Sequence, residues 1–166
     1  MKIKFVCICS FFAFFFVLMS CMRESELIYP RLDLEVRVVD ENGEKLSGAW
    51  VNIFVNKGAY NDYLRFNPEG KPGKIQDRLL PGIYAAETNQ EGVVLIQEIE
   101  LTSGVSVLLG KDYQFSPNPI YLRAEAMRVH NSDTIYLTND ADSLLFGQLS
   151  GSGTRLSEQI TLTVRP

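Results

Sequence analysis

The sequence predicts an all-β fold, a two-sheet antiparallel β-sandwich of seven to nine strands with one long inserted loop. Apolar and polar residues alternate over short segments, which is the period of a half-buried strand. Gly, Asn and Asp turn residues separate these segments about every ten residues, a spacing typical of sandwiches. No segment carries an apolar stripe of 3.6-residue period over the length of a helix.

The first 20 residues are typical of an export signal. Lys2 and Lys4 precede an apolar run over residues 5–19, the arrangement of a secretory signal peptide. The run has about 15 residues, fewer than the roughly 20 that a spanning helix needs; an uncleaved membrane helix is the alternative. The ending Leu18-Met19-Ser20-Cys21 resembles the lipobox of bacterial lipoproteins. That resemblance implies cleavage before Cys21, with fatty acyl chains such as palmitate on this residue.

Residues 21–31 then form a lipidated tether, and residues 32–166 form the sandwich domain. The tether is polar and contains Pro30, so nothing in it needs to fold. Residue 22 is Met, whereas lipoprotein sorting rules place Asp there for retention at the inner membrane. The resemblance therefore implies lipid anchoring in the outer membrane of a Gram-negative cell, facing either the periplasm or the cell surface.

The charge of the chain argues against a nucleic-acid partner, and its cysteine content argues against an internal disulfide. Removal of residues 1–20 takes away two of 16 basic side chains and none of 20 acidic ones, which leaves a net charge of −6. Because a phosphate backbone needs clustered Lys and Arg, we expect no nucleic-acid partner. No cysteine follows Cys21, so we expect burial, without any internal disulfide, to stabilise the domain.

The first two strands are predicted to form an opening hairpin. Alternate apolar residues face inward in both, and the turn 40–43 between them contains Asn42 and Gly43, which tolerate positive φ. Trp50 has the opposite parity and either packs under the next segment or faces solvent. Residues 57–82 are rich in Pro and Gly, which break helices and ladders, and predict an inserted loop. The inward residues are Leu32, Leu34, Val36 and Val38, then Val51, Ile53 and Val55.

Later segments repeat the strand pattern. In residues 120–126 the apolar side chains face inward, and Tyr121, Arg123 and Glu125 face outward. The last segment, 160–164, is predicted as an edge strand to which another chain can add a strand. The expected strands are 83–88, 93–98, 105–109, 120–126, 134–138, 144–149 and 160–164.

The opening segment resembles a known family of sandwiches. Val39-Asp40-Glu41-Asn42-Gly43-Glu44-Lys45-Leu46-Ser47-Gly48-Ala49-Trp50-Val51-Asn52-Ile53 is similar to the start of carboxypeptidase regulatory-like domains, which are transthyretin-like (prealbumin-like) and related to Ig-like sandwiches. Thr88-Asn89-Gln90-Glu91-Gly92-Val93-Val94 resembles a second signature of that family, and Tyr121-Leu122-Arg123-Ala124 a later strand. The resemblance implies an accessory or adhesive module, because these residues specify a backbone and no chemistry.

No residue pattern predicts catalysis, a metal or a cofactor. His130 is the only histidine, and His130, Ser132 and Asp133 are too close in one turn to form a catalytic relay. Asp140 and Asp142 offer oxygen ligands for calcium, but Leu144 follows where a ligand is needed, and a strand-connecting turn explains them better. We therefore expect a protein that is not an enzyme and that holds no metal or cofactor.

Aromatic residues in the inserted loop are the best lead to a ligand. Tyr60, Tyr63 and Phe66 stand among amide and charged neighbours, a composition that suits stacking on sugars or on a partner's surface. The alternative is that they fold back and cap the sandwich.

The leading functional hypothesis is a lipid-anchored structural or adhesion module of the cell envelope, acting through its loops or strand edges on other envelope proteins. The alternative is a glycan-binding accessory lipoprotein that uses Tyr60, Tyr63 and Phe66 for nutrient capture.

Overall fold

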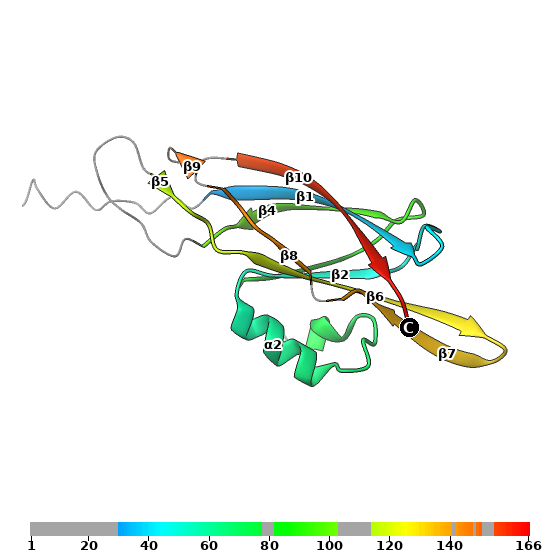
Figure 1. Cartoon of the computed structure of the whole chain (residues 1–166). Coiled ribbons are helices and arrows are strands. Elements are labelled where there is room, and N and C mark those ends of the chain that lie inside the picture. Colours follow the sequence, from blue (N-terminus) through cyan, green and yellow to red (C-terminus); the bar gives the residue numbers. More distant parts are fainter. Residues whose placement is uncertain (1–29, 78–81, 103–113, 141, 148, 151–154) are drawn as a thin grey trace, which may run out of the picture.

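The computed structural model describes residues 30–77, 82–102, 114–140, 142–147, 149–150 and 155–166. These residues contain ten strands, one α-helix and one 3-10 turn (Figure 1). In chain order they are β1 Arg31–Asp40, β2 Trp50–Phe54, α2 Lys57–Phe66, η1 Lys74–Asp77, β3 Ile83–Glu87, β4 Val93–Glu100, β5 Gln114–Phe115, β6 Ile120–His130, β7 Asp133–Thr138, β8 Asp142–Leu144, β9 Leu149–Ser150 and β10 Arg155–Val164.

Two main sheets confirm the predicted all-β sandwich. The first sheet, sheet A, has the order β10-β1-β4, and the second, sheet B, has the order β3-β2-β6-β7, with β8 also paired to β6. Strands β5 and β9 form a separate two-stranded ladder. The core lies between sheets A and B, where inward residues of β1, β2, β4, β6 and β10 meet. Burial of these alternating aliphatic side chains stabilises the sandwich.

One strand pair departs from the antiparallel arrangement. Strands β1 and β10 are parallel and in register over ten residues, from Arg31 opposite Arg155 to Asp40 opposite Val164. On its other edge β1 is antiparallel to β4, and this ladder shifts register between Leu32 and Leu34. Glu98 has φ +59° at this bulge, and Asp33 accepts a hydrogen bond from its backbone N–H over 3.1 Å. The bulge is therefore held by a side chain of the neighbouring strand.

Three sequence predictions about pairing and strand bounds need correction or comment. The predicted opening hairpin is wrong, because β1 belongs to sheet A and β2 to sheet B. Of the described residues in the predicted strand 144–149, only Leu144 and Leu149 are in strands, β8 and β9. The predicted strand 105–109 lies outside the described residues. Turn chemistry identifies where a strand ends, but the partner is chosen by packing across the core.

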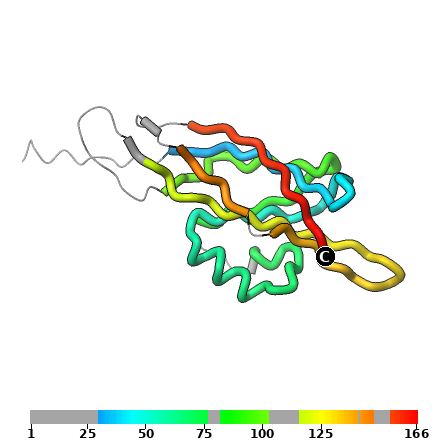
Figure 2. Tube along the Cα trace, in the orientation of Figure 1, coloured from blue at the N-terminus to red at the C-terminus, as the bar shows by residue number. Residues whose placement is uncertain are grey.

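The segment 57–82 is not the irregular loop that was predicted. Residues 57–66 form the helix α2, which covers the outer face of sheet B with η1 (Figures 1 and 2). Asn56 caps the helix, because its Oδ1 accepts from the N–H groups of Gly58 and Ala59 over 2.7 and 3.4 Å. Tyr60 and Tyr63 are three residues apart, so both face the sheet. Only two of the ten helix residues are buried, so the sequence shows no apolar stripe of helical period that would have predicted this helix.

The chain between α2 and η1, residues 67–73, is called the return segment here, and it passes close to β7. Gly70 has φ +67°, and a Cβ atom there would lie 2.0 Å from Cγ2 of Thr138. Only glycine fits this backbone conformation and this spacing. Trp50 packs against the same insertion, because a Cβ atom at Gly73 would lie 3.5 Å from its indole, which agrees with one of the two positions expected for it. The insertion therefore packs closely on the outer face of sheet B.

Candidate functional site

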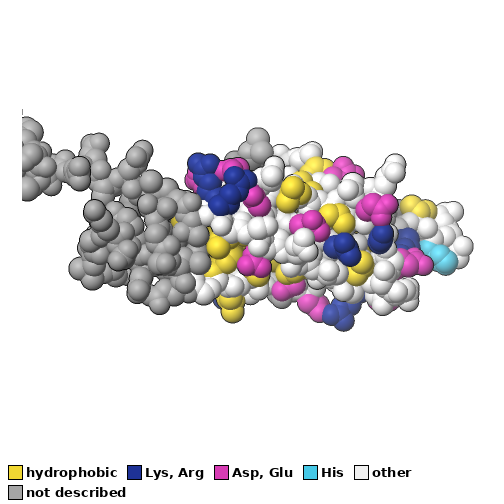
Figure 3. All heavy atoms as spheres, turned by 90° about the horizontal axis from the view of Figure 1, so that it is seen from above, with side chains coloured by type: hydrophobic (Ala, Val, Ile, Leu, Met, Phe, Trp, Pro, Cys, Tyr) yellow, Lys and Arg dark blue, Asp and Glu magenta, His cyan; other side chains and the backbone are white. Residues whose placement is uncertain are grey.

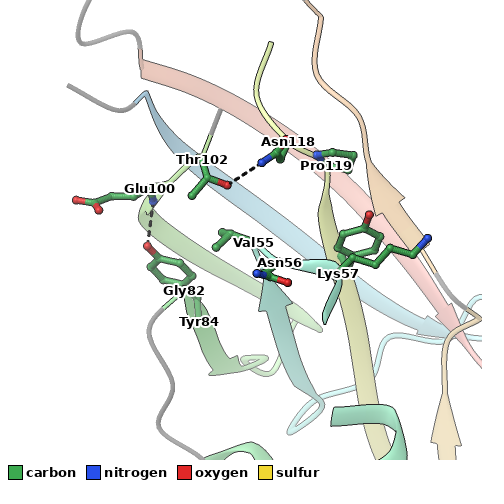
Figure 4. Close-up of a pocket in the computed structure, with 10 residues that line it drawn as sticks. Val55, Asn56, Lys57, Gly82, Tyr84, Glu100, Thr102, Asn118 and Pro119 are labelled. Atoms are coloured by element: carbon green, nitrogen blue, oxygen red, sulfur yellow. Dashed lines mark hydrogen bonds between the residues drawn. The ribbon is translucent and has the colours of Figure 1, made fainter. Parts of the chain in front are cut away.

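A pocket of about 600 Å³ opens at the end of the sandwich where α2 begins (Figure 4). Its walls come from the end of β2, the start of α2, the start of β3, the chain after β4 and the start of β6. This volume lies within the range of small-molecule sites in proteins. The polar and aromatic side chains of its lining include Asn56, Lys57, Tyr84, Thr102, Asn118 and Tyr121.

Two tyrosine rings give the pocket its apolar surfaces. The Tyr84 hydroxyl accepts a hydrogen bond from the backbone N–H of Glu100 over 3.0 Å, which holds the ring in place (Figure 4). Tyr121 stacks on Tyr60, with ring centroids 5.4 Å apart and an interplanar angle of 21°. Each ring is thus positioned by the fold before a ligand arrives, which lowers the entropy cost of binding.

Three side chains beside these rings have polar atoms that bind no described residue. The Asn118 Nδ2 group donates to Thr102 Oγ1 over 3.3 Å, and no described residue binds its Oδ1. Asn56 uses its Oδ1 as the helix cap, and no described residue accepts a hydrogen bond from its amide N–H groups. Among the described ion pairs none involves Lys57. An acceptor, amide donors and an ammonium group therefore stand beside two aromatic surfaces.

A second polar cluster lies buried beneath α2, around Glu125 of β6. Glu125 has no exposed surface and accepts three hydrogen bonds. Asn52 Nδ2 and the Tyr63 hydroxyl donate to its Oε2 over 3.1 and 3.0 Å, and Asn67 Nδ2 donates to its Oε1 over 2.9 Å. The guanidinium of Arg123 lies 3.8 Å from Oε1. We call these five residues the Glu125 cluster.

The cluster changes the acidity of its members. Burial raises the pKa of Glu125 to about 7, against the donors Tyr63, Asn52 and Asn67 and the positive charge of Arg123, which lower it. Burial also raises the pKa of the Tyr63 hydroxyl, and the Glu125 charge adds to this rise. Asn52 Oδ1 and Arg123 Nε are buried without a hydrogen-bond partner in the described structure. A fully buried carboxyl group with a raised pKa and several hydrogen-bond donors around it makes this cluster a second candidate site.

The structure places two of the three predicted aromatic residues, Tyr60 and Tyr63, inside the protein and leaves Phe66 exposed. Tyr60 and Tyr63 are only 4% and 2% exposed, and both rings lie against Phe54, at centroid distances of 5.5 and 5.3 Å. Phe66 is 40% exposed and lies 6.3 Å from Tyr63. Neither tyrosine offers a face to a surface ligand, so the prediction of ligand contact at Tyr60 and Tyr63 is corrected and the capping alternative describes their position.

The other sequence candidates do not converge on one site. His130 is exposed at the tip of the β6–β7 hairpin, opposite Asp133, in a turn with positive φ at Asn131 and Ser132. Asp140 pairs with Arg165, and Asp142 accepts from the backbone N–H of Ser143. No group of three His, Cys, Asp or Glu side chains in the described part of the chain is placed to hold a metal ion. Cys21 lies outside the described residues.

The pocket could not be found from the sequence, because its residues come from four separate segments. Tyr121 has the outward parity of a strand residue, whereas Tyr84 lies opposite the inward residue Ile53 and packs against the core, so parity along the sequence does not bring the two rings together. On the face seen in Figure 3, acidic and basic side chains lie interspersed, and a group of basic side chains at one edge lies against acidic ones. Among the described residues, no helix is both long and apolar enough to span a bilayer.

No family model and no curated protein matches this sequence. Solved structures that resemble it include catechol 1,2-dioxygenase of Acinetobacter radioresistens, with 12% identity and a TM-score of 0.42 over 87% of this chain and 55% of the enzyme. A proposed carbohydrate-binding protein of Pseudomonas aeruginosa has 12% identity and a TM-score of 0.34, over 87% of this chain and 94% of that protein. The chain thus spans about half the length of the dioxygenase.

These neighbours contradict the prediction that the protein is not an enzyme. Dioxygenases acting on catechol, 3-chlorocatechol and hydroxyquinol are among them, so that prediction is withdrawn. It depended on the lack of a catalytic pattern along the sequence, whereas catalytic groups from distant segments meet only in the fold. Identities of 10–16% and TM-scores of 0.35–0.42 assign none of those activities to this chain.

Proposed function

We propose that this chain is a lipid-anchored envelope protein, held in the outer membrane through Cys21, whose transthyretin-like sandwich is an interaction module that binds carbohydrate in the end pocket. The observation that carries the proposal is the pocket itself. Tyr84 and Tyr121 offer aromatic surfaces, and Asn56, Lys57 and Asn118 offer hydrogen-bonding groups beside them.

This combination matches the chemistry of a sugar ring. A pyranose presents C–H groups on its faces, which pack on aromatic rings, and hydroxyl groups at its rim, which bind amide and charged side chains. The site differs from the one predicted from Tyr60, Tyr63 and Phe66, but it keeps the same ligand class and the proposed role in nutrient capture.

Substitution of the pocket residues tests this proposal. The double variant Lys57→Ala, Asn118→Ala removes an ammonium group and an amide from exposed or half-exposed positions. We expect it to weaken retention on a panel of immobilised polysaccharides by about tenfold or more, since each lost polar contact costs on the order of 1 kcal/mol. Affinity electrophoresis measures the loss, and Arg65→Ala, on the exposed side of α2, is the matched control.

Two results would contradict carbohydrate binding in the pocket. The first is a protein that is retained equally well with and without the two side chains. The second is a folded wild-type protein that none of the polysaccharides retains.

A second candidate function is adhesion by strand addition, and the outer edge of β10 favours it. β10 pairs with β1 along its full length, while its other edge carries no ladder among the described residues. Ser157, Gln159 and Thr161 are exposed along it, and backbone groups of an open edge pair readily with another strand. Glu158 has the parity of the inward residues but is exposed, which favours a basic residue opposite it in the added strand.

A proline scan from Ser157 to Thr161 tests strand addition. Proline removes one backbone N–H, and a position whose N–H points away from β1 tolerates it in the isolated domain. We expect such a variant to keep the melting temperature and to lose assembly, measured by size-exclusion chromatography with the partner fraction. Unchanged assembly in all folded proline variants would end this hypothesis.

A further inference from the structure

The Glu125 cluster is the polar attachment between the helical insertion and sheet B. Tyr63, in the middle of α2, and Asn67, its C-cap residue, both donate to the Glu125 carboxyl group. Asn67 also fastens the return segment, because its amide donates to the Lys71 carbonyl and its Oδ1 accepts from the Lys71 N–H, both over 3.0 Å. One carboxyl group on the sheet thus joins the helix and the segment that follows it. Both segments lie on the same side of sheet B (Figures 1 and 2).

We propose that Glu125 is a pH-sensitive latch, which holds the α2 insertion closed on sheet B when it is protonated and loosens it when it is ionised. The proposal goes beyond carbohydrate binding and does not depend on it. The insertion also carries Asn56 and Lys57 of the pocket wall, so loosening of α2 would alter the pocket.

The charged and polar groups that face the Glu125 carboxyl group come from β6, α2, β2 and the return segment. From β6 Arg123 faces it, and from α2 the Tyr63 hydroxyl does. From β2 and the return segment it meets the neutral amides of Asn52 and Asn67. The Lys71 ammonium pairs with Glu69 instead, over 2.6 Å. Arg123 is therefore a positive charge that favours the carboxylate, at a distance of 3.8 Å, beyond a hydrogen bond.

The cluster has partners for both forms of the carboxyl group. In the ionised form three donors point at it. In the protonated form it needs an acceptor, and Asn52 Oδ1 is a buried acceptor that no described donor reaches. A half-turn of the Asn52 amide would present this oxygen to the Glu125 proton. The Tyr63 hydroxyl can also rotate and accept.

Burial decides which form the closed state prefers. Full removal from water disfavours the carboxylate more than three donors and a distant guanidinium favour it, so the pKa stands at about 7, above the ordinary 4.5. The stabilisation that this group adds to the closed state is therefore complete below pH 4.5 and is lost as the pH rises through 7. Opening of α2 lets water reach the carboxylate and relieves the cost.

The pH dependence of α2 opening tests the latch in the unmodified protein. Trp50, the only tryptophan, is the cross-strand partner of Glu125 and packs against the insertion, so its fluorescence reports on the cluster. We expect a fluorescence transition centred near pH 7. We also expect the opening constant of α2, from amide exchange corrected for intrinsic rates, to rise up to about 75-fold between about pH 5 and pH 8.5.

Three variants separate the latch from a general effect of pH. Glu125→Gln is uncharged at every pH and should remove both the transition and the rise in exchange. Glu158→Gln changes an exposed glutamate of β10 and should leave both intact. Tyr63→Phe deletes one hydrogen bond that favours the carboxylate, so it should move the midpoint to higher pH, which a merely structural role of the hydroxyl would not do.

Carbon-13 NMR of the Glu125 carboxyl group gives a second measurement that needs no substitution. A midpoint near pH 7 that coincides with faster exchange in α2 supports the latch, even if Glu125→Gln fails to fold. The latch is overturned if the carboxyl group titrates below about pH 5, or if α2 exchange stays constant while it titrates. It is also overturned if folded Glu125→Gln retains the transition.

Discussion

Tyr63→Ala is expected to lower the free energy of unfolding by about 3–5 kcal/mol, the range for removing a large aromatic side chain from a packed interior. Tyr63 is 2% exposed and lies 5.3 Å from the ring of Phe54. Its loss leaves a cavity between α2 and sheet B. It also removes a donor from the buried carboxyl group of Glu125, which adds to the cost. Urea unfolding followed by circular dichroism measures the change.

Phe66→Ala is the matched comparison for Tyr63→Ala, because it removes another ring from the same helix. Phe66 is 40% exposed, so we expect a loss of about 1 kcal/mol or less. Equal effects of the two substitutions would contradict the assignment of Tyr63 to the core. A Tyr63→Ala protein of normal stability that fails only to bind polysaccharide would restore the earlier hypothesis that this ring contacts a ligand.

Cys21→Ser is expected to move the protein from the membrane fraction to the soluble fraction or to leave it unprocessed. The hydroxyl group of serine does not replace the thiol as the site of acylation. Several acyl chains, each contributing about 0.8 kcal/mol per buried methylene, hold a domain firmly on a bilayer, so their loss should be close to all-or-none. Partition into Triton X-114 and mass spectrometry of the amino terminus measure the outcome.

Cys7→Ser and Cys9→Ser are the controls for the anchor, because both lie inside the segment predicted to be removed. These two variants should stay in the membrane fraction with an acylated terminus at residue 21. An unacylated amino terminus in the wild-type protein, or membrane retention of Cys21→Ser, would contradict the anchor and the envelope location with it.

If both the pocket and the latch operate, the protein would couple pH to ligand binding. The pocket wall and the latch share the α2 insertion, and the Tyr60–Tyr121 stack connects them. The two proposals still fail independently. Loss of polysaccharide binding tests the pocket alone, and amide exchange in α2 tests the latch without any ligand.

The sequence by itself determined the fold class and the inward face of most strands. Leu32, Leu34, Val36 and Val38 in β1, like Ile120, Leu122 and Ala124 in β6, are all fully buried, as their alternation predicts. A strand places every second side chain on one face whatever its partner is, so parity can be read from local sequence. The turn residues Asn42 and Gly43 marked the end of β1 for the same local reason.

The tertiary structure alone decided which strands pair and that a helix covers the outward face of sheet B. The parallel pairing of β1 with β10 joins residues more than 120 positions apart, and no local pattern encodes it. Glu125 carries the outward parity of a solvated strand residue, yet α2 covers it completely. That helix is stabilised by packing of Tyr60 and Tyr63 on Phe54, a contact with another element that a helical periodicity search does not detect. Both the pocket and the buried carboxyl group depend on this contact.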